Sequence, residues 1–176
     1  MQDDSSGTKP VADNMKIDLD ALAAYLRDHV QGFSGASATD LQIEQFKGGQ
    51  SNPTFKLTAG DQRYVVRTKP APAAKLLKSA HAIEREFRVM DALSKAGFPA
   101  ARQYALCEDE SVIGRAFYVM EFIEGRVFWD QSLPGMTPAE RGAIYDEMNR
   151  VISLLHTLDY QAIGLGDYGK AGGYFE

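Results

Sequence analysis

The stretch from Phe46 to Arg67, FKGGQSNPTFKLTAGDQRYVVR, constrains the fold more than any other part of the chain. Two turn signals interrupt alternating apolar and polar residues, one at Gly48 and Gly49 and one between Ala59 and Gln62. Alternation with a period of two is typical of half-buried strands, and short glycine-containing turns join such strands into hairpins. The pattern predicts three consecutive antiparallel strands: Leu41 to Phe46, Thr54 to Thr58 and Arg63 to Thr68.

The first turn, Gly48-Gly49-Gln50-Ser51-Asn52, has two interpretations. Glycine has no Cβ, so backbone N–H groups in such a turn can approach an anion closely, as a phosphate would require. Two glycines followed by polar residues also form ordinary hairpin turns. The turn alone leaves both interpretations open.

Composition excludes several classes of function. The net charge of −5 gives no basic stripe for nucleic acid, and no apolar run is long enough to cross a membrane. Cys107 is the only cysteine, which argues against a disulfide framework and a thiolate metal site. Residues 1–16 begin with an acidic, polar segment unlike a secretory signal, so we expect a mobile tail on a cytoplasmic protein.

Two helices are expected around the hairpins. Apolar residues recur at helical spacing from Asp18 to Val30 and again from Ser79 to Gly97. In the second helix, Glu86 falls within the arc of the apolar stripe between Ile83 and Leu93.

A carboxylate in that arc favours a cationic partner, because an unpaired buried charge is costly. Arg67, at the end of a predicted strand, is the natural candidate. Alternatively, Glu86 reaches solvent, or pairs locally with Arg85 or Lys95.

The remaining sequence changes from strands to helix. Residues 103–107 and 116–122 predict two more strands, which gives an α+β lobe of five antiparallel strands with one inserted helix over residues 17–123. A linker follows over residues 124–136. Thr137, Pro138 and Glu140 form a helix-start signature, and the helix is expected to run to about Leu158 within an incomplete helical lobe, residues 137–176.

Taken together, these segments resemble a known family. The stretches FKGGQSNPTFKLT, YVVRTKP, KSAHAIEREFRVMDAL, CEDESVIGRAFYVMEFIEGRVFWD and LHTLDYQAIGLGDYGKAGGYFE are similar to the aminoglycoside phosphotransferase-like kinases. Within them, the nearest resemblance is to the kinase-like domain of acyl-CoA dehydrogenase family members 10 and 11. The resemblance covers about Leu41 to Glu176 and implies a protein kinase-like fold.

The resemblance also implies roles for individual residues. The turn from Gly48 to Thr54 would lie over the phosphates of ATP, Arg67 would replace the lysine that contacts them, and Glu86 would pair with Arg67. A guanidinium differs from an ammonium in offering a planar, bidentate fork. The hinge that faces adenine through its backbone would consist of Met120, Glu121, Phe122 and Ile123.

The sequence departs from the family in one respect. The family's His-Gly-Asp catalytic loop, which supplies the base and a Mg²⁺ ligand, is absent, since the three histidines are followed by Val30, Ala82 and Thr157. Asp167-Tyr168-Gly169 looks like a kinase metal motif, but the family has a loop there, so we assign no catalytic or metal-binding residue.

We therefore expect the N-terminal part of an ATP- and Mg²⁺-dependent phosphotransferase that acts on a hydroxyl of a small molecule, such as a hydroxyacyl compound. By itself it should be inactive. The alternative is a non-catalytic nucleotide-binding or protein-interaction module, which would associate through the exposed apolar face of its last helix, from Ile144 to Leu155.

Overall fold

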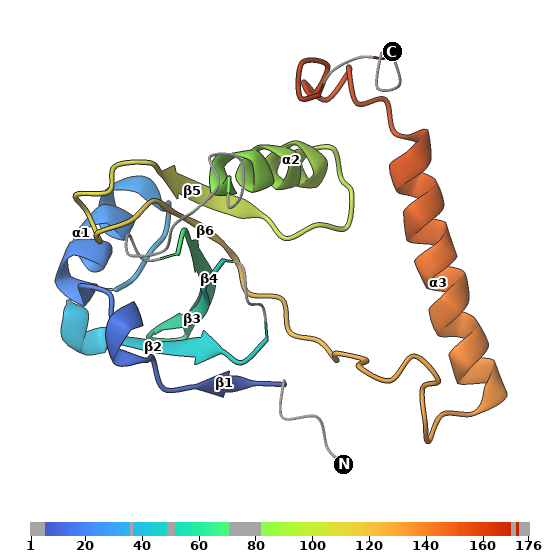
Figure 1. The fold of residues 1–176 in the computed structure, drawn as a ribbon, viewed down its shortest axis with the longest axis horizontal. Helices are drawn as coiled ribbons and strands as arrows, with labels where there is room; N and C mark the ends of the chain where they lie inside the picture. The colour runs from blue at the N-terminus through green and yellow to red at the C-terminus, as the bar shows by residue number, and fades with distance from the viewer. Residues whose placement is uncertain (1–5, 36, 49–51, 71–81, 170–171, 173–176) are drawn as a thin grey trace.

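A computed structural model describes residues 6–35, 37–48, 52–70, 82–169 and 172 (Figure 1). An antiparallel sheet with two helices forms one part of the molecule, and a long third helix stands beside it at the end of an extended linker. The architecture is α+β, as predicted. No helix in the described part of the chain is long and apolar enough to span a bilayer.

The sheet has six antiparallel strands in the order β1-β2-β3-β4-β6-β5. Their bounds are Thr8–Lys9 for β1, Leu41–Phe46 for β2, Thr54–Ala59 for β3, Gln62–Thr68 for β4, Gln103–Cys107 for β5 and Phe117–Glu121 for β6. Strands β2 to β6 are the five that the sequence predicts, within one residue at each end.

The predicted number of five strands is wrong by one. The sixth strand, β1, lies in the segment expected to be a tail, where Thr8 pairs with Phe46 and Lys9 with Gln45. The Thr8 hydroxyl also donates to Glu44 at 2.7 Å. Two residues carry no periodicity, so the sequence could not reveal this strand.

The turn between β3 and β4 sets the register of the hairpin. Gly60 has φ +56°, a conformation that favours glycine, and Ala59 pairs with Gln62 across a two-residue loop. This register places Thr54 opposite Arg67 at the other end of the hairpin.

One face of the sheet, which we call the closed face, packs against helix α1, Leu19–His29. The Asp18 side chain accepts a hydrogen bond from the Ala21 N–H and caps the helix. The main core joins α1 to this face and contains Leu22, Leu26, Phe55, Leu57, Tyr64, Val66, Phe117 and Val119. Two short 3-10 helices, Asp13–Met15 and Ala38–Asp40, flank α1.

The opposite face, which we call the open face, carries Arg63, Val65 and Arg67 of β4. Helix α2, Ile83–Lys95, covers only its β5–β6 side. The apolar cluster beneath α2 is small and separate from the main core; it consists of Ile83, Ala116 and Tyr118, with Phe87, Leu106 and Met120 packed against them.

Helix α3, Pro138–Thr157, begins where its signature predicts. The Thr137 hydroxyl accepts from the Glu140 N–H, and the Glu140 carboxylate accepts from the Thr137 N–H, which forms a capping box. The helix has no buried residue among its twenty. Its apolar side chains are therefore not part of a core in the described chain.

Candidate functional site

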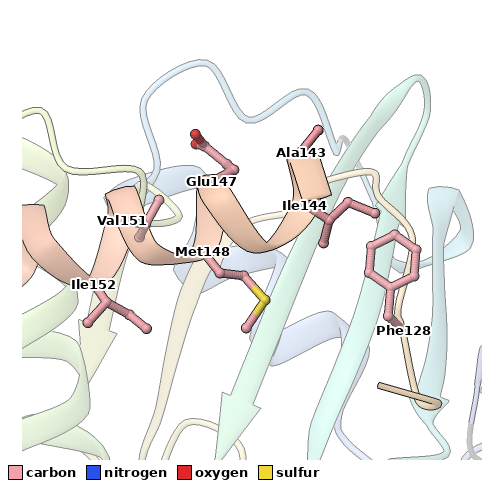
Figure 2. A pocket seen from close by; sticks show the side chains of 7 residues that line it. All are labelled: Phe128, Ala143, Ile144, Glu147, Met148, Val151 and Ile152. Atoms are coloured by element: carbon pink, nitrogen blue, oxygen red, sulfur yellow. The ribbon is translucent and has the colours of Figure 1, made fainter. Parts of the chain in front are cut away.

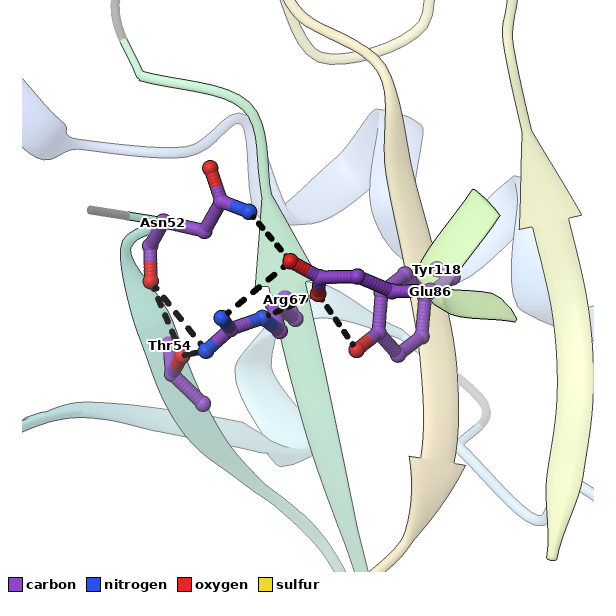
Figure 3. A network of polar contacts seen from close by, with 5 residues as sticks. All are labelled: Asn52, Thr54, Arg67, Glu86 and Tyr118. Carbon is purple, nitrogen blue, oxygen red and sulfur yellow. Dashed lines mark hydrogen bonds and ion pairs between the residues drawn. The ribbon is translucent and has the colours of Figure 1, made fainter. Parts of the chain in front are cut away.

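The carboxylate of Glu86, in the first turn of α2, is the centre of a polar network on the open face (Figure 3). Its Oε2 accepts from Arg67 Nε at 2.7 Å and from the Tyr118 hydroxyl at 3.2 Å. Its Oε1 accepts from Asn52 Nδ2 at 2.8 Å and from Arg67 Nη2 at 3.5 Å. Strand β4, strand β6 and the end of the glycine turn therefore meet at one side chain of α2.

The predicted pairing of Glu86 with Arg67 is confirmed. The alternative local partners are occupied elsewhere, since Lys95 pairs with Asp91 and Arg85 donates to the carbonyl of Tyr168. The pair is only partly shielded, with 26% of the Arg67 side chain and 36% of the Glu86 side chain exposed. Charge-assisted, two-point contact of this kind fixes the geometry of both groups.

The remaining donors of Arg67 face the glycine turn. Arg67 Nη1 donates to the Thr54 hydroxyl at 2.9 Å and lies 3.5 Å from the Asn52 carbonyl oxygen. Asn52 is itself 2% exposed. The end of the glycine turn is thus tied both to β4 and to α2.

Tyr118 closes the network from β6. Burial, followed by the negative charge of Glu86, raises the pKa of its hydroxyl above the ordinary value. A tyrosine that stays protonated remains a hydrogen-bond donor to the carboxylate.

The predicted hinge, Met120 to Ile123, follows β6. The Glu121 N–H donates to the Arg102 carbonyl at 2.8 Å, so this N–H is already bonded within the protein. The Phe122 ring lies under the guanidinium of Arg63, with 4.9 Å from Cζ to the ring centroid. Ile123 is 60% exposed.

Of the residues predicted in the glycine turn, Gly48 and Asn52 are described, whereas Gly49, Gln50 and Ser51 lie outside the described residues. Gly48 follows the end of β2, and Asn52 lies two residues before β3. The structure therefore fixes both ends of this turn at the edge of the open face.

Asp167, in the triplet that looks like a metal motif, contacts α2. Its carboxylate accepts from Arg88, which lowers the pKa of Asp167 below its usual range. The described residues bring no group of three His, Cys, Asp or Glu side chains together.

Comparison with known proteins identifies the family. The phosphotransferase enzyme family, APH, matches residues 42–176. The chain belongs to this family. The matched range contains the whole network around Glu86, from the glycine turn to β6.

Two mouse proteins are similar to this phosphotransferase-family chain. It is 46% identical to acyl-CoA dehydrogenase family member 11 over 172 residues, which are 98% of this chain and 22% of that protein. It is 46% identical to family member 10 over 168 residues, which are 95% of this chain and 15% of that protein. The chain thus spans about a fifth or less of these relatives.

A solved structure supports the predicted kinase-like fold. A crystal structure from Ralstonia eutropha JMP134, named as an aminoglycoside phosphotransferase, matches with a TM-score of 0.77 and 64% identity. The match covers 91% of this chain and 44% of that one.

Sequence reasoning missed three members of the phosphotransferase-family network: Thr54 and Tyr118 as partners of the ion pair, and Asn52 as a partner of Glu86. The two-residue turn after β3 would have placed Thr54 opposite Arg67. Alternation along β6 would have placed Tyr118 on the same face as Met120. No sequence signal linked Asn52 to α2.

Proposed function

We propose that this chain is the nucleotide-binding half of a phosphotransferase that moves the γ-phosphoryl group of ATP to a hydroxyl of a small molecule. The observation that carries the proposal is the contact of the Glu86 carboxylate with Arg67 and Asn52. It holds a partly exposed guanidinium beside the turn whose backbone would face the phosphates.

The residues present fit the nucleotide. Arg67 directs Nε to Glu86, Nη1 to Thr54 and Asn52, and one N–H of Nη2 to Glu86, which leaves one of its five N–H groups for a phosphate oxygen. Val65 pairs with Met120 on the same face, which gives an apolar floor suited to a base. The hinge role is proposed for the backbone beyond Glu121, because the Glu121 N–H bonds to Arg102.

In the parent reaction, the substrate hydroxyl oxygen forms a bond to the γ-phosphorus, the bond to the ADP oxygen breaks, and the hydroxyl proton passes to a base. This sequence has no His-Gly-Asp segment to supply that base. The residues described do not assemble a Mg²⁺ site either. We therefore propose that the chain binds ATP weakly and transfers no phosphoryl group by itself. We also propose that the parent protein is cytoplasmic and acts on a small hydroxylated substrate such as a hydroxyacyl compound.

Nucleotide titration followed by NMR chemical shifts tests this proposal. We expect a dissociation constant for Mg-ATP on the order of 1 mM, and loss of the shifts in Arg67→Ala. Arg63→Ala is the matched control, because Arg63 lies on the same face of the same strand but pairs with Glu124. Equal binding by Arg67→Ala, micromolar affinity, or steady-state phosphoryl transfer would each contradict the proposal.

A specific observation favours a second function, protein association through α3. An apolar groove of about 590 Å³ lies along this helix, lined by Phe128, Ile144, Met148, Val151 and Ile152 (Figure 2). Met148 is 51% exposed and Ile152 is 48% exposed. An exposed apolar surface of this kind marks an association site.

We propose that the occupant is the rest of a family C-lobe, because more than half of the Ralstonia chain lies outside the match. That remainder, produced separately, should bind this chain, and Ile152→Lys should abolish the complex. Arg150→Lys is the control, because Arg150 pairs with Glu147 and lies on the polar side of α3. Sedimentation that shows no complex, or a stable homodimer in its place, would overturn this second proposal.

A further inference from the structure

The segment after α3 returns to α2 and packs against its outer side. Residues 159–168 form successive turns, with hydrogen bonds from Gly164 N–H to the Gln161 carbonyl at 3.0 Å and from Leu165 N–H to the Tyr160 carbonyl at 2.8 Å. Leu165 is buried. We call residues 159–168 the return segment.

Two arginines, one helical turn apart on α2, hold the return segment. Arg88 Nη2 donates to the Gly164 carbonyl at 2.9 Å, and its guanidinium pairs with the Asp167 carboxylate. Arg85 Nη2 donates to the Tyr168 carbonyl at 3.1 Å, and its Cζ lies 4.2 Å from the centroid of the Tyr168 ring. The two arginines therefore contact two carbonyls, a carboxylate and an aromatic ring of the return segment, and we call this set of contacts the junction.

The Arg88 part of this junction lies across α2 from the ion pair. At about 100° per residue, Arg88 is about 200° around the helix from Glu86, so the two side chains leave opposite sides of α2. The sheet holds Glu86 on one side, and the return segment holds Arg88 on the other. Helix α2 is therefore held by the sheet on one side and by the return segment on the other.

The return segment also reaches the site itself. Tyr168 lines a cavity of about 400 Å³ together with Arg67, Glu86, Met90 and Tyr118. Since the apolar cluster beneath α2 is small and separate from the main core, polar contacts decide much of the position of this helix.

We propose that Arg85 and Arg88 are positioning residues, which act through the return segment to hold α2 where Glu86 meets Arg67. The segment that follows α3 is thereby coupled to the ion pair of the N-lobe. Only the consequence for ATP rests on the proposed function; the coupling itself does not.

The test is the NMR signal of the Arg67 Nε–H, the group that donates to Glu86 at 2.7 Å. In Arg88→Asp, we expect this proton to exchange with water about fivefold faster, because α2 loses its outer contact and the pair opens more often. The double variant Arg88→Asp with Asp167→Arg should restore most of the slow exchange, since the reversed ion pair can form. Arg85→Gln should give a smaller increase.

Lys95→Gln is the matched control, because the ion pair of Lys95 with Asp91 lies within α2. It should leave the Arg67 signal unchanged. An unchanged Arg67 signal in Arg88→Asp, or no recovery in the double variant, would overturn the proposal even if the melting temperature fell.

The same variants separate this inference from the proposed function. If the Arg67 signal responds but Mg-ATP shifts are absent in the unmodified chain, the coupling stands and the nucleotide proposal fails. If Mg-ATP binds and the Arg67 signal is insensitive to Arg88, the coupling fails and the nucleotide proposal stands.

Discussion

The closed and open faces of the sheet use the same strands for different purposes. On the closed face, Phe55, Leu57 and Val66 are fully buried against α1 in one continuous apolar core. On the open face, the next residues along the same strands, Thr54 and Arg67, form a polar network with Glu86. Because burial on one face stabilises the sheet, the other face is left to hold partly exposed charges.

Phe55→Ala should have the largest effect on stability. Phe55 is 0% exposed, so removing its ring leaves a cavity in the main core and should lower the free energy of unfolding by about 3–5 kcal/mol. Chemical denaturation measures the loss. Phe128→Ala, in the exposed linker, is the control and should cost about 0.5 kcal/mol or less. Equal losses would show that the closed face is not the main source of stability.

Glu86→Ala should have an intermediate effect. The substitution removes the carboxylate that accepts from Arg67, the Tyr118 hydroxyl and the Asn52 amide, which should cost about 1–3 kcal/mol. Glu84→Ala is the control on the same helix, because the ion pair of Glu84 with Lys69 is partly exposed and its loss should cost about 0.5 kcal/mol. The difference between the two variants in urea denaturation is the quantity to measure. A smaller loss for Glu86→Ala than for Glu84→Ala would contradict a structural role of the network.

Tyr25→Phe should have the smallest effect, and the size of this effect should change at alkaline pH. Burial, followed by the nearby Cys107, raises the pKa of Tyr25 to about 12 from an ordinary value of about 10. The unfolded chain therefore loses this proton first, so stability is fully present below pH ~10 and falls as pH rises toward ~12. Removing the hydroxyl should flatten this fall, although it also removes a hydrogen bond of 3.0 Å to the Leu106 carbonyl.

Melting temperatures of the wild type and Tyr25→Phe at pH 8 and pH 11 measure this effect. The gap between the two proteins should narrow as pH rises. Tyr160→Phe is the control, because Tyr160 is exposed. A gap that widens with pH would show that Tyr25 does not resist ionisation in the fold.

The elements of this fold were predictable where local chemistry decides them. Period-two alternation gave β2 to β6, the Thr137 cap fixed the start of α3, and the Asp18 cap fixed the start of α1. The partner of Glu86 was one of the alternatives that the sequence offered, because helical spacing placed the carboxylate inside an apolar arc, where a cation offsets the cost of burial.

The unpredicted features depend on contacts between distant segments. Strand β1 has two residues and no pattern of its own, and it exists because β2 offers a free edge. The Asn52 contact to Glu86 joins residues 34 positions apart, and the Arg88 contact to Asp167 joins residues 79 apart. Periodicity describes one element at a time, so it cannot predict contacts between distant segments.

The short strand β1 also shields one end of a sheet edge. It occupies the hydrogen-bonding edge of β2 next to the glycine turn, and Lys47 donates its N–H to the Gly7 carbonyl at 3.1 Å. An uncovered strand edge is a template for pairing with another molecule. Truncation past Lys9 would therefore uncover this end of the β2 edge beside the proposed phosphate turn, and pairing of two copies through β2 would cover that turn.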